Sequence, residues 1–453
     1  MKKLVALLLA AMMLCVCIPA MAEEAPEGYP EVVPGVDLGG ISVTIYDYWS
    51  GEGARNENPD PQTQAQYDYR DWLMETYNCT IQQMQDGDWG SNATQLTNFF
   101  AAPDGSYRLY ILPPDFVGGP MANNAFADWN NNDLIDLTAE KWNQATVAFM
   151  SSGEKVFGVS TGNSEPRACL YFNKRILSEA GIDWNTVYDM QAEGTWTWAA
   201  WEDMMTKIQK DEDNDGVIDL YGFTGSKEDL LMCSVFGNGG SFFDFDENGK
   251  LVITAGSDAS MEALNWAKSV LDNFYWNGGP DAAWDFYKDA FKQGKAGFYV
   301  YQTYGGFNAN AELSDMVDDW GCVAIPVKEA GMTYVTTVSD NVTVIPNVYD
   351  DETVAKLAFI YDMWSNATPG YDDEFGWIEN KYDYTDDRAV DETYAMLRES
   401  DHCVANKCLY LGSVNDVLGD GFLWNMLGQT PAELLESVTP KWQGMCDAFN
   451  ASK

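Results

Sequence analysis

The sequence predicts an α/β protein whose sheets are mostly parallel and flanked by helices. Strand-like segments alternate with helical segments along most of the chain, which is the pattern that parallel sheets produce. A length of 453 residues, with 46% hydrophobic and 14% aromatic residues, gives material for two domains or for one body of two lobes. We therefore expect a folded chain rather than a disordered one.

The first 22 residues have the features of a secretory signal peptide. Lys2 and Lys3 precede an apolar run, and Ala20 and Ala22 stand just before Glu23, as small residues do at a cleavage site. Residues 23–40 are rich in Pro and Gly and are expected to form an N-terminal arm. No later run of about 18 apolar residues follows, so we predict a secreted protein without a membrane-spanning segment after cleavage.

Acidic residues dominate the mature chain. Cleavage removes two lysines from 26 Lys and Arg and none of the 70 Asp and Glu, which leaves 24 basic against 70 acidic residues, or about −46. We exclude nucleic acid as a partner, because binding to it needs clustered basic residues. The same negative field disfavours highly anionic ligands and favours neutral ones.

Nine cysteines are present, and two of them lie in the signal peptide. The seven that remain are an odd number, so at least one is unpaired, and Cys169 and Cys322 are expected to be buried in strands. The spacing of Cys403 and Cys408 leaves open whether they form a disulfide. A single His excludes a zinc site built from His ligands.

The first part of the mature chain is predicted to form a strand, a helix and two further strands, an order that is typical of an open α/β sheet. Ile41–Trp49 alternates apolar and polar residues as a strand does, and the glycines of Ser50–Gly53 end it. Open α/β sheets bind ligands at the carboxyl ends of their strands, so residues that follow strands are candidates for a site. The next predicted elements are a helix around Gln66–Tyr77, a strand at Thr80–Met84 and a strand at Tyr107–Leu112.

The rest of the chain continues this alternation. Thr197 is a suitable N-cap for the helix Trp198–Lys210, and Asn248-Gly249 is a strong hairpin turn signal within Ser241–Thr254. Residues 370–392 are acid-dense and are expected to form a solvated loop, and Thr430 begins a capping box for the last helix. The remaining predicted elements are strands at Ala168–Phe172, Val217–Phe223 and Tyr334–Ile345 and helices at Met261–Trp276 and Glu352–Trp364.

The loop after the helix Trp198–Lys210 resembles a calcium loop of the EF-hand type. Asp211, Asp213 and Asp215 alternate, Gly216 permits a sharp turn, Val217 offers its carbonyl oxygen, and Asp219 ends the series. Oxygen ligands at this spacing predict a structural Ca²⁺ site. The twelfth position holds Gly222 instead of the usual Glu, so a further ligand must come from elsewhere, and an acidic turn without metal is the alternative.

Several segments resemble, in their order, the extracellular solute-binding proteins of ABC importers, a group that includes maltose- and oligosaccharide-binding proteins. The matching segments are LYFNKRILSEAGIDW (Leu170–Trp184), GTWTWAAWEDM, DEDNDGVIDLYGF, DAFKQGKAGFYVYQTYG (Asp289–Gly305), DDWGCVAIP (Asp318–Pro326) and QTPAELLESVTPKW (Gln429–Trp442).

The resemblance implies a two-lobed, type II periplasmic-binding-protein-like fold with a hinge between the lobes. Lobe 1 is expected to hold residues 41–165 and 327–370, and lobe 2 residues 166–326 and 371–453. It also implies a monomer, extracellular or periplasmic, that binds a small carbohydrate, most readily a neutral oligosaccharide, and delivers it to the membrane subunits of an ABC permease. Leu14 before Cys15 and Val16 before Cys17 replace the small residue of a lipoprotein signal, which argues against the family's lipid anchor.

Seventeen Trp and 24 Tyr favour a sugar ligand, because aromatic faces stack on sugar rings while polar groups bind the hydroxyls. Most of these aromatic residues must belong to the core. Trp284 and Trp377 are further candidates for the rim of a cleft, and Asn341 adjoins one candidate. The predicted ligand-binding residues, taken from strand ends and from the resemblance, are Tyr48, Trp49, Asp115, Arg167, Tyr304, Asp340, Tyr410 and Ser413.

Two enzymatic functions are alternatives to a binding protein. Gly158–Gly162 matches the GxSxG pattern of serine hydrolases and His402 follows it, but a strand rather than a helix is expected after the serine. The second alternative is a glycosidase or lyase. Such an enzyme uses a pair of carboxylates, but the chain has so many acidic residues that the presence of a pair does not indicate one. We therefore predict no enzyme, with a secreted carbohydrate-active enzyme, a carrier of a non-sugar solute or an adhesion protein as alternatives.

Overall fold

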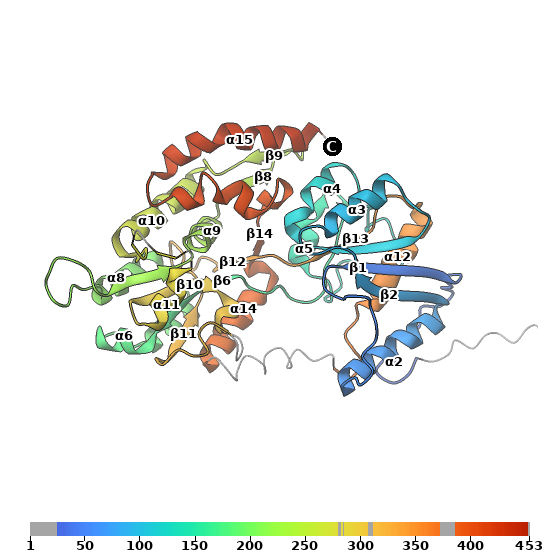
Figure 1. Cartoon of the computed structure of the whole chain (residues 1–453), viewed down its shortest axis with the longest axis horizontal. Coiled ribbons are helices and arrows are strands. Elements are labelled where there is room, and N and C mark those ends of the chain that lie inside the picture. The colour runs from blue at the N-terminus through green and yellow to red at the C-terminus, as the bar shows by residue number, and fades with distance from the viewer. Residues whose placement is uncertain (1–24, 280–281, 284, 307–310, 372–385, 452–453) are drawn as a thin grey trace, which may run out of the picture.

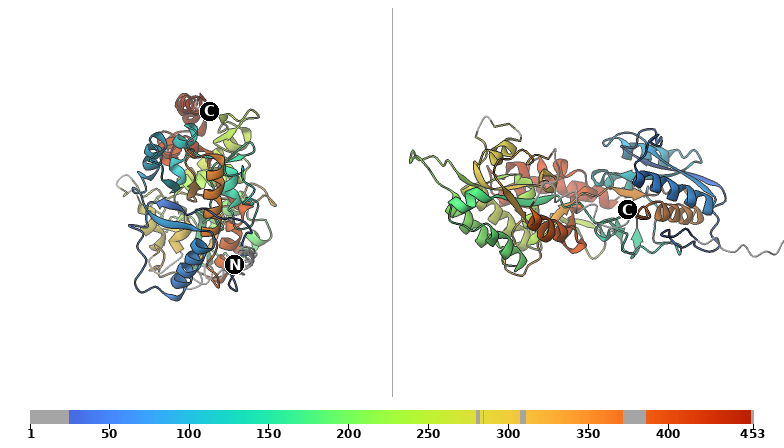
Figure 2. Two further views of the ribbon diagram at one scale, coloured as in Figure 1. Left: turned by 90° about the vertical axis from the view of Figure 1, so that its right-hand side faces the viewer. Right: turned by 90° about the horizontal axis from the view of Figure 1, so that it is seen from below.

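A computed structural model describes residues 25–279, 282–283, 285–306, 311–371 and 386–451. The elements group into two bodies along the long axis, each with a four-stranded sheet (Figure 1). The same elongated arrangement is visible from below (Figure 2). We keep the names lobe 1 and lobe 2 for these bodies, while the residue boundaries given above stay a prediction. Within the described residues, no helix is both long enough and apolar enough to cross a membrane.

Lobe 1 contains the first strands of the chain. Its sheet has the order β13-β3-β1-β2, in which β1 runs parallel to β2 and β3, and β13 runs antiparallel to β3. In β1, Val43, Ile45 and Asp47 alternate as buried residues, as the pattern of the sequence predicts. The strands are β1 (Ile41–Asp47), β2 (Cys79–Gln85), β3 (Tyr107–Leu112) and β13 (Val342–Val344), with a small hairpin of β4 (Ser151–Ser152) and β5 (Lys155–Val156).

Helices cover this sheet and bring distant parts of the chain together. Asp60 caps the first long helix by accepting from Thr63 N–H at 2.8 Å, and Tyr69 donates to the carbonyl oxygen of Met363 at 2.7 Å, which joins α2 to α12. The helices are α2 (Pro61–Thr76), α3 (Asn92–Ala101), η1 (Pro114–Phe116), α4 (Gly118–Ala122), α5 (Gln144–Phe149) and α12 (Asp351–Trp364).

Lobe 2 contains a sheet of order β11-β6-β10-β7. The central strand β6 (Ala168–Asn173) is buried along its whole length. It runs antiparallel to β10 (Ala296–Gln302) and β11 (Trp320–Val323), whereas β7 (Tyr221–Gly225) runs parallel to β10. Three of these four strands therefore share one direction, and β6, by which the chain enters the lobe, opposes them.

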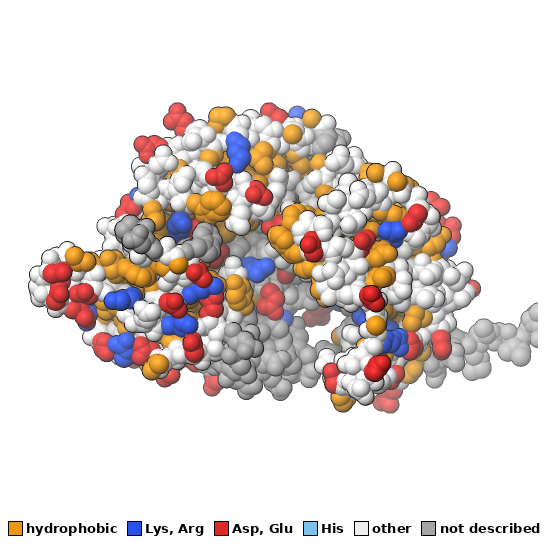
Figure 3. Space-filling view, in the orientation of Figure 1, with side chains coloured by type: hydrophobic (Ala, Val, Ile, Leu, Met, Phe, Trp, Pro, Cys, Tyr) orange, Lys and Arg blue, Asp and Glu red, His pale blue; other side chains and the backbone are white. Residues whose placement is uncertain are grey.

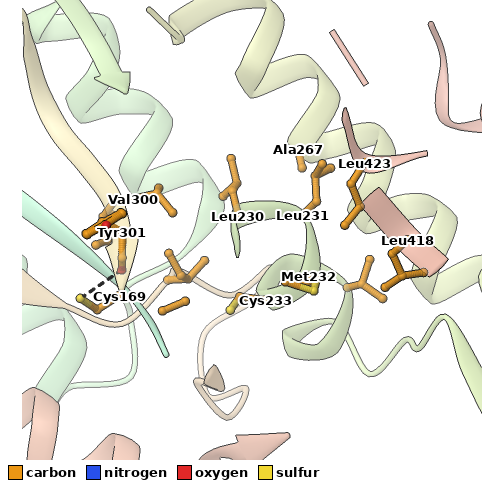
Figure 4. Packing of buried hydrophobic residues seen from close by; sticks show 14 of the residues in the cluster. Cys169, Leu230, Leu231, Met232, Cys233, Ala267, Val300, Tyr301, Leu418 and Leu423 are labelled. Atoms are coloured by element: carbon orange, nitrogen blue, oxygen red, sulfur yellow. Dashed lines mark hydrogen bonds between the residues drawn. The ribbon is translucent and has the colours of Figure 1, made fainter. Parts of the chain in front are cut away.

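Helices surround this second sheet on several sides. Figure 4 shows α9 between the sheet, represented by Cys169, Val300 and Tyr301, and the C-terminal segment, represented by Leu418 and Leu423. The helices are α6 (Lys174–Glu179), α7 (Asn185–Ala192), α8 (Trp198–Ile208), α9 (Lys227–Gly237), α10 (Asp258–Phe274), α11 (Phe286–Lys292), η2 (Thr303–Gly306) and α14 (Ala395–Arg398).

The C-terminal segment completes lobe 2. In the last helix, α15 (Pro431–Ala451), Asn450 accepts from and donates to the backbone of Leu251, which holds the helix on the hairpin β8–β9. The remaining elements are β8 (Phe243–Phe245), β9 (Leu251–Ile253), η3 (Ala389–Tyr394), η4 (Ser400–His402), β14 (Cys403–Ala405), η5 (Lys407–Tyr410), η6 (Asn415–Gly419) and η7 (Leu423–Asn425).

Two connecting segments between the lobes lie side by side. The outgoing segment passes Val159 and Arg167, and the returning segment contains β12 (Thr336–Val338) before β13. Val159 and Thr343 exchange backbone hydrogen bonds of 3.0 and 2.7 Å, and Arg167 N–H donates to the carbonyl oxygen of Thr337 at 2.9 Å. β12 also pairs with β14. Both strands lie between the two bodies, in the middle of the molecule (Figure 1).

Several predicted elements differ from those observed. The predicted strand Tyr334–Ile345 forms β12 and β13, which belong to different sheets. The strand predicted at Val217–Phe223 begins only at Tyr221, because the residues before it remain in the acidic loop. The end of the predicted solvated loop 370–392 runs into the helical segment η3, in which Ala389, Val390, Thr393 and Tyr394 are buried. Residues 372–385 of that loop lie outside the described residues.

Other predictions are confirmed. Strand β3 occupies Tyr107–Leu112, and the hairpin turns at Gly249 with a positive φ. Thr430 and Glu433 bond reciprocally as a capping box, through Thr430 N–H to the carboxylate at 2.9 Å and Glu433 N–H to the hydroxyl at 3.3 Å. Cys169 and Cys322 are buried strand residues, and Cys403 and Cys408 are both free thiols. The signal peptide falls outside the described residues.

Candidate functional site

A cavity of about 560 Å³ lies between the lobes. The space-filling view shows a recess in the middle of the molecule, between the two bodies (Figure 3). Trp89 and Asp115 come from lobe 1, and α9, α11, the end of β10 and the C-terminal segment supply the facing wall. A hollow of about 770 Å³ is lined by lobe 1 alone, and one of about 850 Å³ is lined by lobe 1, the outgoing segment and residues 398–400. Of the three, the cavity of about 560 Å³ is the one lined at the ends of a strand from each sheet, by Asp115 after β3 and by Gln302 at the end of β10. The cavity between the lobes is therefore the candidate site.

The lobe 1 wall is formed where β3 ends. Pro113 and Pro114 stop the strand and begin η1, which presents Asp115 to the cavity. Burial raises the pKa of Asp115, and the hydrogen bond from its own amide and the nearby Arg167 oppose that rise. Trp89 packs edge-on against Phe116 with ring centroids 4.7 Å apart, and half of its surface remains exposed. This wall offers one aromatic face and one carboxylate.

The start of α9 forms the floor on the lobe 2 side. Ser226 caps the helix by accepting from Asp229 N–H at 3.2 Å, and Glu228 forms a 2.8 Å ion pair with Lys227. Asp229 is only 6% exposed, and burial raises its pKa to about 6. The nearby Ser226 hydroxyl and Arg167 only partly oppose that rise. A carboxylate in this position is costly to keep ionised unless a ligand compensates it.

Tyrosines line the wall at the end of β10. The hydroxyl groups of Tyr301 and Tyr304 lie 3.2 Å apart, and Tyr301 also donates to Glu312 at 3.2 Å. Tyr304 remains 46% exposed, and Tyr287 and Lys288 reach the same wall from α11. Lys288 forms an ion pair with Glu312. The wall therefore presents aromatic faces and hydroxyl groups, while its lysine already has a partner.

Arg167 lies at the point where the chain crosses between the lobes. Its backbone is fixed on both sides, since its N–H donates to the Thr337 carbonyl oxygen at 2.9 Å and its own carbonyl accepts from Thr303 N–H at 3.1 Å. To the described residues, its guanidinium makes neither a hydrogen bond nor an ion pair of contact length. It nonetheless interacts electrostatically with Asp115, Asp229 and Asp340. Arg167 is also part of the cavity lining.

Four of the eight predicted ligand-binding residues line the cavity together, namely Asp115, Arg167, Tyr304 and Ser413. Ser413 accepts from Asp416 N–H at 3.2 Å and donates to the Asp416 carboxylate at 2.8 Å. The fold brings these four predicted residues together from segments that are far apart in the sequence. Trp284 and Trp377, the further rim candidates, lie outside the described residues.

The other four lie elsewhere. The Tyr48 hydroxyl donates to Asn341 at 3.0 Å, and the Tyr48 ring packs edge-on against half-exposed Trp49. Asp340 accepts from the Ser164 hydroxyl at 2.6 Å and from Glu165 N–H at 3.3 Å, and burial raises its pKa. These contacts join the end of β1 and the outgoing segment to the returning segment.

Tyr410 belongs to the core and not to the cavity. It is 2% exposed and stacks on Phe149 with ring centroids 4.9 Å apart. Its carbonyl oxygen lies so close to Gly118 that a Cβ there would be 2.1 Å away. The residue therefore joins the C-terminal segment to lobe 1, and its ring is enclosed by apolar neighbours.

Sequence reasoning missed several residues that line the cavity. Asp229 follows Ser226 at N-cap spacing, which was the one available signal for the start of α9. Trp89 and Trp424 lie outside the long helices and strands, where no periodic pattern points to them, and both remain partly exposed. The missed residues that matter most to the site are Trp89, Glu228, Asp229, Tyr287, Lys288 and Trp424.

The GxSxG pattern does not assemble a serine hydrolase. Ser160 donates to the Thr146 hydroxyl at 2.8 Å, and Nδ1 of His402 lies 2.6 Å from the carbonyl oxygen of Tyr334. An extended segment and then β6 follow the pattern, whereas a nucleophile elbow needs a helix at once. Ser160 and His402 are thus both engaged with other groups.

The acidic loop projects from the end of α8 at the edge of lobe 2 (Figure 1). Oxygen atoms from Asp211, Asp213 and Asp215 come within 4.8 Å of one another. Asp219 instead accepts from Glu212 N–H at 2.8 Å, and Gly222 packs against Met205 inside β7. Three carboxylates thus fit a hard cation such as Ca²⁺, while the twelfth position contributes no side chain.

Comparison with known proteins agrees with this architecture. The sequence profile of the bacterial extracellular solute-binding proteins matches residues 59–361. A search of curated protein sequences finds no significant match.

Three solved structures illustrate the similarity of fold. The GacH receptor of Streptomyces glaucescens, solved unliganded and with acarbose, is 15% identical, with 90% of this chain and 99% of that chain covered and a TM-score of 0.53. The cyclic α-maltosyl-1,6-maltose binding protein of Arthrobacter globiformis is 18% identical, with coverage of 91% and 98% and a TM-score of 0.54. UgpB of Mycobacterium tuberculosis, in complex with glycerophosphocholine, is 14% identical, with coverage of 88% and 98% and a TM-score of 0.54.

The profile covers about two thirds of the chain, and the two sheets with an intervening cavity have the two-lobed architecture of these structures. The chain therefore belongs to the family of bacterial extracellular solute-binding proteins.

Proposed function

We propose that this protein is the secreted substrate-binding component of an ABC importer and that it carries a carbohydrate, most readily an oligosaccharide. The observation that carries the proposal is the cavity between the lobes, whose lining combines exposed aromatic side chains with polar groups from both sides. Lobe closure around the sugar would engage both walls at once, and only such differential contact favours a closed state. The protein would act as a monomer and deliver its ligand to the permease.

The chemistry of the lining supports a sugar. Trp89, Tyr304 and Trp424 offer partly exposed rings for stacking on the C–H faces of sugar rings. Asp115, Asp229 and Arg167 offer acceptors and donors for hydroxyl groups. Two of the solved structures described above have carbohydrate or carbohydrate-like ligands, and the third has a glycerol phosphodiester, so the fold accommodates hydroxylated solutes of several kinds.

A carbohydrate-active enzyme is the second candidate, and one observation favours it. Burial raises the pKa of Asp229 to about 6, the range of a general acid in glycoside hydrolysis, and Asp115 lies on the facing wall. A carrier needs the same carboxylate only as a hydrogen-bond acceptor. We propose the carrier because the chain belongs to a family of binding proteins.

A panel of mono- and oligosaccharides tests the proposal. The mature protein is screened by thermal shift, and each hit is then measured by calorimetry and incubated overnight for analysis of the sugar by mass spectrometry. We expect saturable binding of one sugar per chain with the sugar recovered intact, and a ligand at 100 times its Kd adds about 2.7 kcal/mol of stability. Conversion of any glycan would favour the enzyme, and failure of the whole panel would contradict a sugar carrier.

We further propose that Asp211, Asp213, Asp215, Val217 and Asp219 form a structural Ca²⁺ site. Its support is the close approach of three carboxylates, together with the spacing of the loop. Its place at the end of α8 separates it from the cavity lining, so the ion would stabilise the loop without contacting the sugar.

A further inference from the structure

The charges that line the cavity do not balance. Four carboxylates line it, from Asp115, Glu228, Asp229 and Asp285, against the two basic side chains of Arg167 and Lys288. A neutral sugar needs no such excess, because hydroxyl groups donate and accept in similar numbers. The lining therefore has an excess of negative charge that its own basic side chains do not balance.

The lysines near the cavity are already engaged. Lys288 pairs with Glu312, which does not line the cavity, and Lys227 pairs with Glu228 at 2.8 Å. Once these pairs are set aside, Asp115, Asp229 and Asp285 remain, with Arg167 as the one basic side chain of the described lining. Asp285 is exposed at the rim, so the inner part of the cavity depends on Arg167 for its positive charge.

Arg167 is shared among three carboxylates and is in contact with none of them. Asp115, Asp229 and Asp340 each interact with it electrostatically, but it forms no ion pair of contact length with any described residue. Asp229 is the most enclosed of the cavity carboxylates, and among the described residues only the Ser226 hydroxyl and its own helix start lie close enough to bond to it. One guanidinium thus leaves a net negative charge on the cavity floor.

Aromatic side chains line the same cavity. Trp89, Tyr287, Tyr301, Tyr304 and Trp424 all line the cavity, and the electron-rich faces of such rings attract cations as well as sugar rings. The chain as a whole carries a formal charge of −44, which concentrates cations near its surface. Carboxylates, aromatic faces and the overall field therefore all favour a cation.

We propose that the solute carries a protonated amino group beside its hydroxyl groups, as an amino sugar or an oligosaccharide that contains one. The ammonium group lies between Asp229 and Asp115, where it replaces the missing positive charge, while Arg167 donates to hydroxyl or ring oxygens. The inference rests on the proposed carrier function and deepens it, because it names the chemical class of the sugar.

The test compares pairs of sugars matched in size, of which one member carries a protonatable nitrogen. The pairs are glucosamine with glucose, chitosan tetrasaccharide with its fully N-acetylated form, and acarbose with maltotetraose. Calorimetry on the mature protein at neutral pH measures each affinity. We expect the amino member of at least one pair to bind about tenfold more tightly than its neutral counterpart, as charge-assisted hydrogen bonds to a buried carboxylate require.

Two variants that remove the same charge distinguish the site from the overall field. Asp229→Asn should abolish the preference for the amino member, whereas Asp258→Asn, at the exposed first turn of α10 in the same lobe, should retain it. Asp115→Asn on the facing wall provides a second, less buried variant and should weaken the preference, which covers the case in which Asp229→Asn does not fold.

The outcomes separate this inference from the function on which it rests. Equal or tighter binding of the neutral member in every pair that binds would overturn the amino-sugar inference and leave the carbohydrate carrier intact. Retention of the preference in both cavity variants would also overturn it. Binding of no sugar, amino or neutral, would contradict both.

Discussion

Asp229 is deeply buried, and no basic side chain of the described residues is in contact with it. The groups that face it are Glu228 and Cys233 on its own helix, Arg167 before β6 and Tyr287 on α11. Burial raises the pKa values of Cys233 and Tyr287, so both stay protonated near neutral pH. The pKa of Asp229 is raised from 3.8 to about 6, mainly by burial. Ionisation of this carboxylate therefore lowers the stability of the free protein. Functional sites often carry such a cost in stability.

Asp229→Asn should stabilise the free protein at pH 8. Above pH 6 the aspartate is ionised in both the folded and the unfolded chain, and only the folded chain bears the cost of burying the charge. Each tenfold change in proton affinity corresponds to about 1.4 kcal/mol, and the lost carboxylate at the start of α9 offsets part of the gain, so we expect about 1 to 3 kcal/mol. Urea denaturation of both proteins measures the difference.

The pH dependence provides the control for this prediction. Since an acid with a raised pKa in the folded state loses its burial cost on protonation, the advantage of the Asn variant should shrink as the pH falls from about 6 to about 4. An advantage that persists unchanged at pH 4 would show that charge burial is not its cause.

Some site residues were predictable because they adjoin strands. Asp115 follows β3, Tyr304 follows β10 and Arg167 precedes β6, and since β6 runs antiparallel to β10, these last two lie at the same edge of the sheet. Tyr410 was not predictable in this way. Its neighbours Cys408 and Leu409 are buried with it in a single short turn, where no periodicity separates the core side from the cavity side.

At the scale of elements, the helix that supplies Asp229 is among those that the sequence did not reveal. Residues 229–235 of α9 are all buried, because the helix packs between the sheet and the C-terminal segment (Figure 4). A helix enclosed on all sides carries no polar face, so the spacing of its apolar residues gives no helical pattern. The amphipathic helices α8, α10 and α12, in contrast, were predicted to within a few residues at each end.

The returning segment shows a second limit of local reasoning. Tyr334–Ile345 reads as one strand, yet the chain leaves the pairing with β14 and joins β3 of the other lobe a few residues later. Asp340 and Asn341 lie at the change, bonded to Ser164 and Tyr48 respectively. Local sequence records strand propensity, but the partner of a strand is set by the tertiary fold.

The acidic loop permits a prediction at the same scale. If Asp211, Asp213 and Asp215 hold Ca²⁺, removal of the ion with EGTA should lower the Tm, because three carboxylates held within 4.8 Å then repel one another. Calorimetric scans with EGTA, and with EGTA followed by excess Ca²⁺, measure the loss and its recovery. Asp213→Asn should reduce the effect of EGTA, whereas Asp203→Asn on the exposed face of α8 should not. An unchanged Tm, with no calcium found by elemental analysis, would contradict the site.

At the scale of the whole molecule, the connecting segments are where the two lobes would move if they close on a ligand. The outgoing and returning segments are bonded to each other at Val159 and Thr343 and again at Arg167 and Thr337. Arg167 belongs to both the connection and the cavity lining, so a ligand bound to its guanidinium would act at the connection between the lobes. Closure would bring Trp89 and Asp115 of lobe 1 toward the tyrosines and Asp229 of lobe 2.

Small-angle X-ray scattering of the mature protein, with and without the sugar that binds most tightly in the panel, tests this account most directly. Closure of two lobes over a ligand shortens the molecule, so we predict a smaller radius of gyration at saturating sugar and its return after dialysis. A radius of gyration that stays the same at saturation would contradict the central claim that the lobes move together around their ligand.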